Sequence, residues 1–162
     1  MRKRIEWQSY AVHNDKEIKG FFGEGENGYR FLSNFHIFEE PVIFEAMNFF
    51  ATENAYMAAK TYDVNDRYRL VGMSPAEARK FGQTIKLRPD WELVKEDFMF
   101  LFNYQKYERN LDLRRKLLET GNKYLEETNS WGDVFWGVDI NKGGQNKLGK
   151  ILMRVRQMFK IH

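Results

Sequence analysis

The amino-acid sequence predicts a compact, mostly helical α+β fold with short β-strands in a single domain. Hydrophobic residues make up 43% of the 162 residues and charged residues 30%, which is the balance of a globular chain. The length is that of one domain with one core. Several stretches repeat apolar residues at helical spacing, and shorter apolar runs lie between turn residues. These three observations favour helices as the main elements.

The chain shows no linker, low-complexity tract or internal repeat. The first residues are polar with turn signals, so we expect an N-terminal arm or strand over 1–20 and one domain over 21–162. Gly23, Gly25 and Gly28 spell G-x-G-x-x-G within the aromatic stretch 20–35. No long helix follows, and Pro41 interrupts the pattern, so a hairpin or a mobile loop fits better than a dinucleotide-binding turn.

Between residues 42 and 82 the pattern predicts one strand and two helices. Residues 42–50 are a short apolar stretch of strand character. Thr52 is placed to cap a helix that continues through Lys60, because strong helix formers follow it. Ser74 begins a capping box with a proline at the first helical position, and Gly82 ends that short helix.

The second half of the chain predicts three helices and two strand-like runs, 124–128 and 134–140. Asp90 opens a long helix whose apolar stripe we assign to the core: Trp91, Val94, Phe98, Leu101 and Phe102. Another helix runs from Asn110 to Gly121 and turns inward Leu113, Leu117 and Leu118. Asn146 caps a last helix with the inward face Leu148, Ile151, Leu152, Val155 and Phe159.

Composition excludes several kinds of site. The chain has no cysteine, which excludes disulfides, thiolate metal sites and a cysteine nucleophile. Its histidines have no zinc-binding spacing, and neither a P-loop nor a G-x-S-x-G elbow occurs, so we expect no metal and no cofactor. No apolar run approaches the ~18 residues of a membrane span, and no signal-peptide core follows the basic start. We therefore expect a cytoplasmic protein without membrane partners.

Charge and aromatic content narrow the class of partner. The net charge of +3 is a small surplus, which mixed surface charge explains better than nucleic-acid binding does. A small phosphorylated ligand needs only two or three cations, so the charge is compatible with one. Aromatic residues form 16% of the chain. Rings at helical spacing belong to the core, whereas rings in loops are candidates for stacking on a ligand.

The predicted helix 52–60 is the first candidate for chemistry. Glu53 and Lys60 are seven residues apart, which places them about 20° from each other on one helix face. Tyr56 and Met57 lie between them on that face. Each charge also suits its end of the helix dipole, which is the structural interpretation. The neighbouring ring and thioether instead indicate a face that is not simply solvated.

The stretch 129–137 is the second candidate. Trp131, Asp133 and Trp136 are close together beside Gly132 and Gly137. The two rings either cover an edge of the core or form walls of a cleft, where Asp133 would act as an acid, a base or a stabiliser of a cation. The structural alternative has Asp133 in an Asx-turn. The following glycine-rich loop leads into a helix N-terminus, which suits an anion or is an ordinary cap.

Six segments occur in the order seen in the NADAR, or YbiA-like, N-glycosidase family, which the chain resembles from about residue 21 to residue 159. They are FLSNF (31–35), TENAYMAAK (52–60), MSPAEARKFGQTIKLRPDW (73–91), LLETGNKYLEE (117–127), WGDVFWG (131–137) and GQNKLGKILMRVR (144–156). The doubled W-G-D-x-x-W-G form resembles variants carried by phages and bacteria.

The resemblance implies a compact YbiA-like α+β fold that hydrolyses the bond between ribose C1′ and a nitrogen without a metal. The family's substrates are ribosylaminopyrimidine phosphates of riboflavin synthesis and ADP-ribose on a nucleobase. The implied catalytic residues are Glu53, Lys60 and Asp133. The implied substrate-binding residues are Arg30, Ser33, Asn34, Phe35, Tyr56, Trp131, Trp136, Gly137 and Asn146.

These residue types suit ribosyl transfer to water. The transition state resembles an oxocarbenium ion, so a carboxylate near C1′, Glu53 or Asp133, stabilises it and orients water. Lys60 acts as an ammonium on the leaving group, as a nucleophile, or as a Schiff-base former. Arg30, Lys147 and Arg156 are the candidate phosphate cations.

Several alternatives stay open. The substrate is either a free metabolite or an ADP-ribosylated macromolecule, which includes a modified nucleic acid. A non-catalytic module that binds ADP-ribose or a nucleotide is the alternative function, and a nucleic-acid binder is a third. The sequence does not indicate an oligomeric state.

Overall fold

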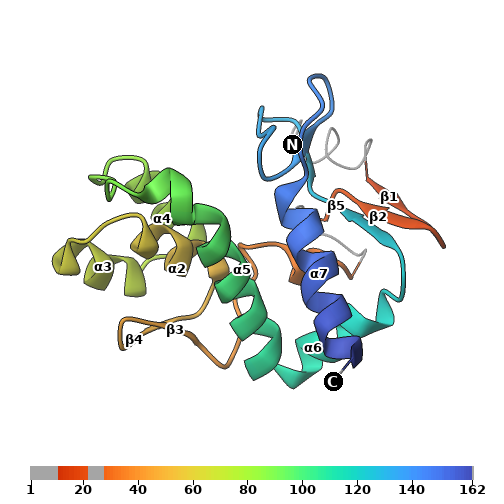
Figure 1. Cartoon of the computed structure of the whole chain (residues 1–162), viewed down its shortest axis with the longest axis horizontal. Helices are drawn as coiled ribbons and strands as arrows, with labels where there is room; N and C mark the ends of the chain where they lie inside the picture. Colours follow the sequence, from red (N-terminus) through yellow and green to blue (C-terminus); the bar gives the residue numbers. More distant parts are fainter. Residues whose placement is uncertain (1–10, 22–27, 162) are drawn as a thin grey trace. The chain divides into compact units, whose positions relative to one another are not determined.

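The computed structural model describes residues 11–21 and 28–161, coloured along the chain in Figure 1. They belong to two compact units, which we describe separately. The central unit is Asn34–Leu113, and the terminal unit is Met1–Ser33 together with Arg114–His162. Among the described residues, no helix is both long enough and apolar enough to cross a membrane. Of the G-x-G-x-x-G stretch, Gly23 and Gly25 lie outside the described residues.

The central unit is built around α2 (Thr52–Ala59), of which every residue is buried. Three helices of the unit contact it, and Figure 1 labels them along the yellow and green part of the chain: α3 (Val64–Val71), α4 (Pro75–Gly82) and α5 (Trp91–Arg109). Three of the eight α2 side chains are alanines, which allow neighbouring helices to approach closely. A charged side chain on α2 therefore lies in the interior of this unit rather than on its solvated surface.

A hairpin replaces the single strand that the sequence predicts over 42–50. β3 (Val42–Phe44) pairs antiparallel with β4 (Met47–Phe49). Glu45 and Ala46 make the turn with φ angles of 50° and 62°. Glycine and asparagine adopt this left-handed region most readily, and neither is present, so the single-strand prediction is wrong for want of a turn signal.

Capping chemistry explains which helix starts were predictable. The Ser74 hydroxyl accepts the Glu77 N–H at 3.2 Å, and Glu77 Oε1 accepts the Ser74 N–H at 3.4 Å, which confirms the capping box of α4. The predicted cap at Thr52 is wrong: Thr52 is already the first helical residue, and Ala51 before it offers no side-chain oxygen.

The sequence analysis does not predict α3. Only Arg67 and Leu70 of this helix are buried, so it has almost no apolar periodicity. The signal that was available is Asp63, whose side chain accepts the N–H groups of Asn65 and Asp66 at the helix start.

The core face of α5 differs from the predicted stripe. Trp91 and Phe102 are buried as predicted, Val94 and Phe98 are half-buried, and Leu101 is 42% exposed, so its assignment to the core is wrong. The buried face continues instead through Met99, Asn103, Lys106 and Tyr107. An amide and an ammonium on that face interrupt the apolar pattern, which is why periodicity placed the stripe incorrectly.

The terminal unit contains a three-stranded sheet in which β2 (Glu17–Lys19) is the middle strand. β1 (Val12–His13) pairs antiparallel with it, and β5 (Tyr124–Glu126) pairs with it in parallel. Segments more than a hundred residues apart in the sequence therefore form one sheet (Figure 1). A short helical turn, η1 (Arg30–Leu32), precedes the central unit.

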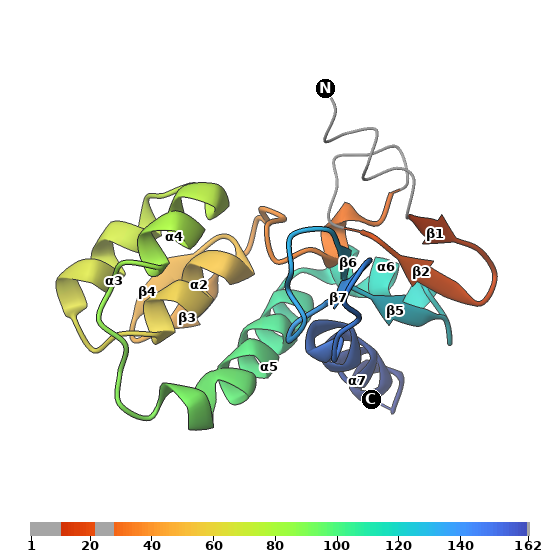
Figure 2. The ribbon, with the colours of Figure 1, turned by 90° about the horizontal axis from the view of Figure 1, so that it is seen from above.

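Helices and a second strand pair complete the terminal unit. α7 (Lys147–Ile161) contacts β5, and its predicted core residues Leu148, Leu152 and Val155 are fully buried. β6 (Thr128–Asn129) and β7 (Val138–Asp139) pair in parallel and are labelled side by side in Figure 2. Between them lies the loop 130–137. α6 (Leu111–Glu119) spans the sequence boundary of the two units.

Candidate functional site

One face of α2 brings together Glu53, Tyr56 and Lys60, as the seven-residue spacing between Glu53 and Lys60 predicts. Glu53 is 8% exposed, and Lys60, which directly follows the helix, is half-buried. The Tyr56 ring lies 5.0 Å from the Trp91 ring between centroids, and Lys60 Nζ lies 5.7 Å from the Tyr56 centroid. An acid, an aromatic ring and an amine thus share a mostly buried face.

The electrostatic setting of Lys60 is unusual for a lysine. Burial, the largest effect, lowers the pKa of its ammonium. Glu53 acts in the opposite direction, whereas the positive charges of Arg79 and Lys95 lower the pKa further. Lys60 therefore releases its proton more readily than an exposed lysine, which a general acid or a nucleophile requires.

Asn34 contacts the first turn of α2 through its backbone. Its backbone C=O accepts the Glu53 N–H at 3.0 Å, so the segment before β3 is bound to the first turn of α2. The Asn34 side chain is 8% exposed and its Nδ2 donates to Met99 Sδ at 3.4 Å. Phe35, the next residue, is half-buried.

Asn103 of α5 is a polar residue of this region that the sequence analysis does not identify. It is fully buried and donates from Nδ2 to the Met99 C=O at 3.0 Å and toward Asn34 Oδ1 at 3.5 Å. Its Oδ1 has no hydrogen-bond partner among the described residues. The sequence feature that could have identified Asn103 is a single amide on the apolar face of a long helix.

In the terminal unit, the loop 130–137 confirms the Asx-turn alternative for Asp133. Asp133 Oδ1 accepts the N–H groups of Phe135 at 3.2 Å and Trp136 at 2.9 Å. Its Oδ2 takes part in no hydrogen bond with the described part of the chain. The carboxylate therefore orders the backbone around Trp136 with one oxygen and keeps the second available.

Two further residues order this loop and were not predicted. Asn129 is fully buried; its Oδ1 accepts the Trp131 and Asp133 N–H groups at 3.3 and 3.1 Å, and its Nδ2 donates to the Asp133 C=O at 2.9 Å. Asp139 Oδ2 accepts the Gly132 N–H at 2.8 Å. Its Oδ1 accepts the N–H groups of the residues two and three positions on, and backbone N–H donors lower the pKa of this carboxyl.

The aromatic residues of the loop do not form a closed core. Trp131 is 39% exposed, and Trp136 is half-buried with its ring edge-to-face against Phe135 at 4.8 Å between centroids. Gly137 faces the backbone C=O of Glu127, which a Cβ at this position would overlap. The exposure of Trp131 is compatible with a ligand-facing role for this ring.

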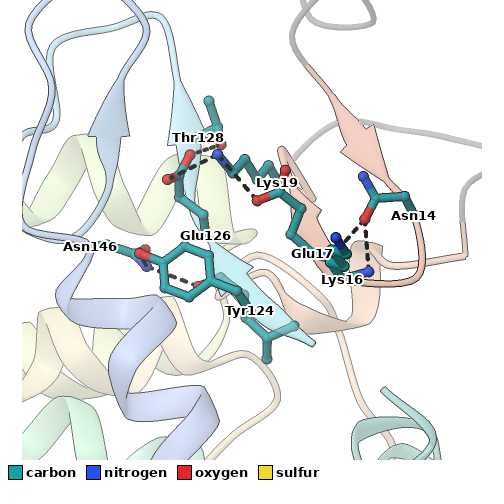
Figure 3. Close-up of polar contacts among 9 residues, drawn as sticks. Asn14, Lys16, Glu17, Lys19, Tyr124, Glu126, Thr128 and Asn146 are labelled. Atoms are coloured by element: carbon teal, nitrogen blue, oxygen red, sulfur yellow. Dashed lines mark hydrogen bonds and ion pairs between the residues drawn. The ribbon is translucent and has the colours of Figure 1, made fainter. Parts of the chain in front are cut away.

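Asn146 has the position that the sequence predicts, directly before α7, but its side chain bonds elsewhere (Figure 3). Its Nδ2 donates to Tyr124 Oη at 3.0 Å and to the Leu125 C=O at 2.9 Å, and its Oδ1 accepts the Glu127 N–H at 3.0 Å. The amide therefore joins α7 to β5. On the same sheet, Glu126 accepts the Thr128 hydroxyl at 2.6 Å.

The candidate phosphate cations of the sequence analysis all lie in the terminal unit. Arg30 is half-buried in η1, next to the buried Ser33. Lys147 Nζ lies 5.7 Å from the Phe135 ring centroid. Arg156 is 6% exposed, and its Nη1 donates to Thr120 Oγ1 at 2.9 Å, so it connects α7 to the end of α6.

The predicted site residues thus form two groups, one in each unit. The structure places Asn34, Glu53, Tyr56 and Lys60 together in the central unit, and orders Asp133, Trp136 and Gly137 in one loop of the terminal unit. Their roles toward a substrate remain predictions. No group of three or more His, Asp or Glu placed to hold a metal ion occurs over 11–21 and 28–161.

Comparison with known proteins defines the class of fold. An NMR structure of the Escherichia coli protein YbiA superposes with a TM-score of 0.78 and 30% sequence identity, covering 93% of this chain and 89% of that chain. The predicted YbiA-like α+β fold is therefore confirmed. Residues 20–160 match the NADAR domain, a match that runs through both units. The chain belongs to the NADAR domain family.

Sequence relatives of the chain include proteins named as N-glycosidases and a riboflavin biosynthesis protein. The chain is similar to the N-glycosidase YbiA of Escherichia coli, with 31% identity over 148 residues and 89% of each chain covered. An N-glycosidase of Nostoc punctiforme is 45% identical over 86 residues, 52% of this chain and 54% of that protein. A riboflavin biosynthesis protein of Vibrio vulnificus is 30% identical over 145 residues, 88% of this chain but 39% of that protein. The matches thus cover only about half or less of these last two relatives.

Proposed function

We propose that the protein is an N-glycosidase that hydrolyses the bond between ribose C1′ and a nitrogen of a phosphate-bearing substrate. The observation that carries this proposal is the shared face of Glu53 and Lys60 on α2. A nearly buried carboxylate and an amine of lowered pKa, with the Tyr56 ring between them, are groups that cleavage of a ribosyl bond requires. The names of the relatives, N-glycosidases among them, support the same class of reaction.

In the direct route, the C1′–N bond breaks as water adds to C1′. Positive charge develops on C1′ and the ring oxygen, which the Glu53 carboxylate stabilises while it accepts a proton from the attacking water. The departing nitrogen takes its proton from the Lys60 ammonium. The products are the phosphate-bearing ribose with a hydroxyl group at C1′ and the base with a proton on the departing nitrogen.

The lowered pKa of Lys60 also permits a covalent route. The neutral amine attacks C1′ as the bond to the base breaks, and the departing nitrogen takes one of the two amine protons. Ring opening then transfers the other amine proton to the ring oxygen and gives a C1′=N Schiff base. Water hydrolyses this imine to the aldehyde and restores the amine. Reduction by cyanoborohydride during turnover distinguishes the routes, because only the covalent one leaves the ribosyl group on Lys60, detected by mass spectrometry.

We assign the cation-stabilising carboxylate to Glu53 rather than Asp133. Glu53 is nearly buried beside Lys60, whereas Asp133 Oδ1 accepts two backbone N–H groups of its own loop. In this assignment Asp133 orders the backbone that carries Trp136. Both chemical routes use only protein groups and water, so the reaction proceeds without a metal.

The test is a product assay with two substrate panels, ADP-ribosylated guanine conjugates and ribosylaminopyrimidine phosphates, with products identified by mass spectrometry. The proposal predicts release of free base from at least one panel, unchanged by EDTA. Binding of ADP-ribose with no base released from either panel after long incubation would support a non-catalytic nucleotide-binding module instead. The two panels also separate the riboflavin-type substrate from the ADP-ribose conjugate.

A further inference from the structure

Two cations on other helices lie close enough to Lys60 to act on its charge. Arg79 belongs to α4 and Lys95 to α5, and both were outside every site that the sequence indicates. Their positive charges lower the pKa of Lys60, which follows α2. Three helices of the central unit therefore converge with one basic side chain each.

The packing of α4 on α2 accounts for the position of Arg79. Gly82 lies against the Met57 side chain so closely that a Cβ on Gly82 would overlap it. Arg79 precedes Gly82 by three residues and Lys60 follows Met57 by three, so each cation lies on the face that carries the contact. The close contact at Gly82 thus lies one turn from each of the two basic residues along the chain.

The packing of α5 on α2 does the same for Lys95. The rings of Trp91 and Tyr56 are in contact at 5.0 Å between centroids. Lys95 lies four residues after Trp91 and Lys60 four residues after Tyr56, one turn further along each helix. Each lysine therefore lies one turn from the aromatic contact, on the same face of its own helix as the ring.

All three cations are partly withdrawn from water. The Lys95 side chain is 18% exposed and its Nζ lies 2.6 Å from Glu92 Oε2, whose side chain is 77% exposed. Arg79 and Lys60 are both half-buried. The positive charges of Arg79 and Lys95 act against that of Lys60, and Glu53 offsets part of this effect. A bound anion with two or more charges would offset it further.

We propose that Arg79 and Lys95, together with Lys60, bind the phosphate group of the substrate, a phosphate monoester or diphosphate attached to the ribose. This inference rests on the proposed function and deepens it, because it assigns the phosphate to the same helix face as Glu53. An Arg guanidinium binds two phosphate oxygens at once and a lysine ammonium binds one as a point charge, so the pair suits such a group.

The test is calorimetric binding of four probes that need no turnover: ADP-ribose, ribose 5-phosphate, pyrophosphate and adenosine. We expect wild-type protein to bind the phosphorylated probes, with affinity that falls as salt rises, and to bind adenosine at least tenfold more weakly. The comparison of ribose 5-phosphate with pyrophosphate distinguishes a monoester site from a diphosphate site.

The variants are Arg79→Gln and Lys95→Gln, each expected to weaken phosphate binding tenfold or more. Lys95→Arg keeps the charge and should stay within about threefold of wild type. Lys80→Gln, on the exposed side of α4, is the matched control and should bind within twofold of wild type.

The outcomes separate this inference from the proposed function. Binding of phosphorylated probes within twofold of wild type in both glutamine variants, or no preference for phosphate in the wild type, overturns the inference. Turnover of a substrate panel by the same variants at the wild-type KM overturns it as well and leaves the N-glycosidase activity standing. Loss of phosphate binding in the variants, combined with no turnover in the wild type, supports the phosphate site and contradicts the activity.

Discussion

The two roles considered for Asp133 can be separated by two substitutions at that one position. Asp133→Ala removes the oxygen that accepts the Phe135 and Trp136 N–H groups at 3.2 and 2.9 Å. Asp133→Asn keeps an acceptor oxygen in the same place and removes only the charge. If Asp133 orders the loop, the alanine variant is the damaging one; if it is the catalytic carboxylate, both are.

The expected loss of stability follows from the two hydrogen bonds. Removal of a side chain that caps backbone N–H groups typically costs about 0.5–2 kcal/mol, so we expect about 1–2 kcal/mol for Asp133→Ala. In a chain of this size that lowers Tm by roughly 2–4 °C per kcal/mol. Asp133→Asn should lose less than about 1 kcal/mol, because the acceptor remains.

The assay combines thermal unfolding with steady-state turnover of the active substrate panel. We expect Asp133→Asn to keep turnover within about tenfold of wild type and Tm close to it, and Asp133→Ala to show the larger loss of Tm. Asp63→Ala is a matched control, since Asp63 Oδ1 also accepts two backbone N–H groups, at 2.8 and 3.2 Å, at the start of α3. A 100-fold or greater loss of kcat in Asp133→Asn would refute the loop role, because losses of that size are typical of acid–base groups.

Three further predictions concern Lys106, Lys60 and Gly137. Burial lowers the pKa of the fully buried Lys106 from 10.5 to about 7. Above pH 7 the unfolded state therefore binds more protons than the folded state, and the unfolding free energy rises with pH by at most about 1.4 kcal/mol per pH unit. Lys106→Met should reduce this slope in urea unfolding between pH 7 and 10, and an unchanged slope would disprove the assignment. If Lys60 attacks as a neutral amine, kcat should rise with pH through a pKa below that of an exposed lysine; a kcat that falls over that range would instead indicate the ammonium. Gly137→Ala should cost about 1–3 kcal/mol in urea unfolding because its Cβ meets the Glu127 C=O, whereas Gly72→Ala, with open space around it, serves as the control; equal stability of the two variants would contradict the packing described.

Local patterns were sufficient for part of the fold and of the candidate site. The spacing of Glu53 and Lys60 placed them on one helix face, and Ser74 with Glu77 marked the start of α4 correctly. Both depend on residues within two helical turns of each other, which a sequence displays directly. The sequence also predicted the Asx-turn of Asp133, because the Asp133 side chain accepts N–H groups from residues only two and three positions further on.

Tertiary contacts account for what the sequence did not reveal. Arg79 and Lys95 come near Lys60 only because two other helices pack on α2, and nothing in their own surroundings marks them. Asn103 and Lys106 lie on a buried face that apolar periodicity alone would place elsewhere. A polar side chain acquires its role there from the neighbours that the fold supplies.

The central claim is that the Glu53–Lys60 face of α2 performs the cleavage. Its most direct test is the turnover of Glu53→Gln and Lys60→Ala on the active substrate panel, with Tm measured for each variant. We predict that each substitution lowers turnover at least 100-fold while Tm stays within a few degrees of wild type, since loss of a general acid or base is worth about 10² to 10⁴. Wild-type turnover in both variants would contradict the claim.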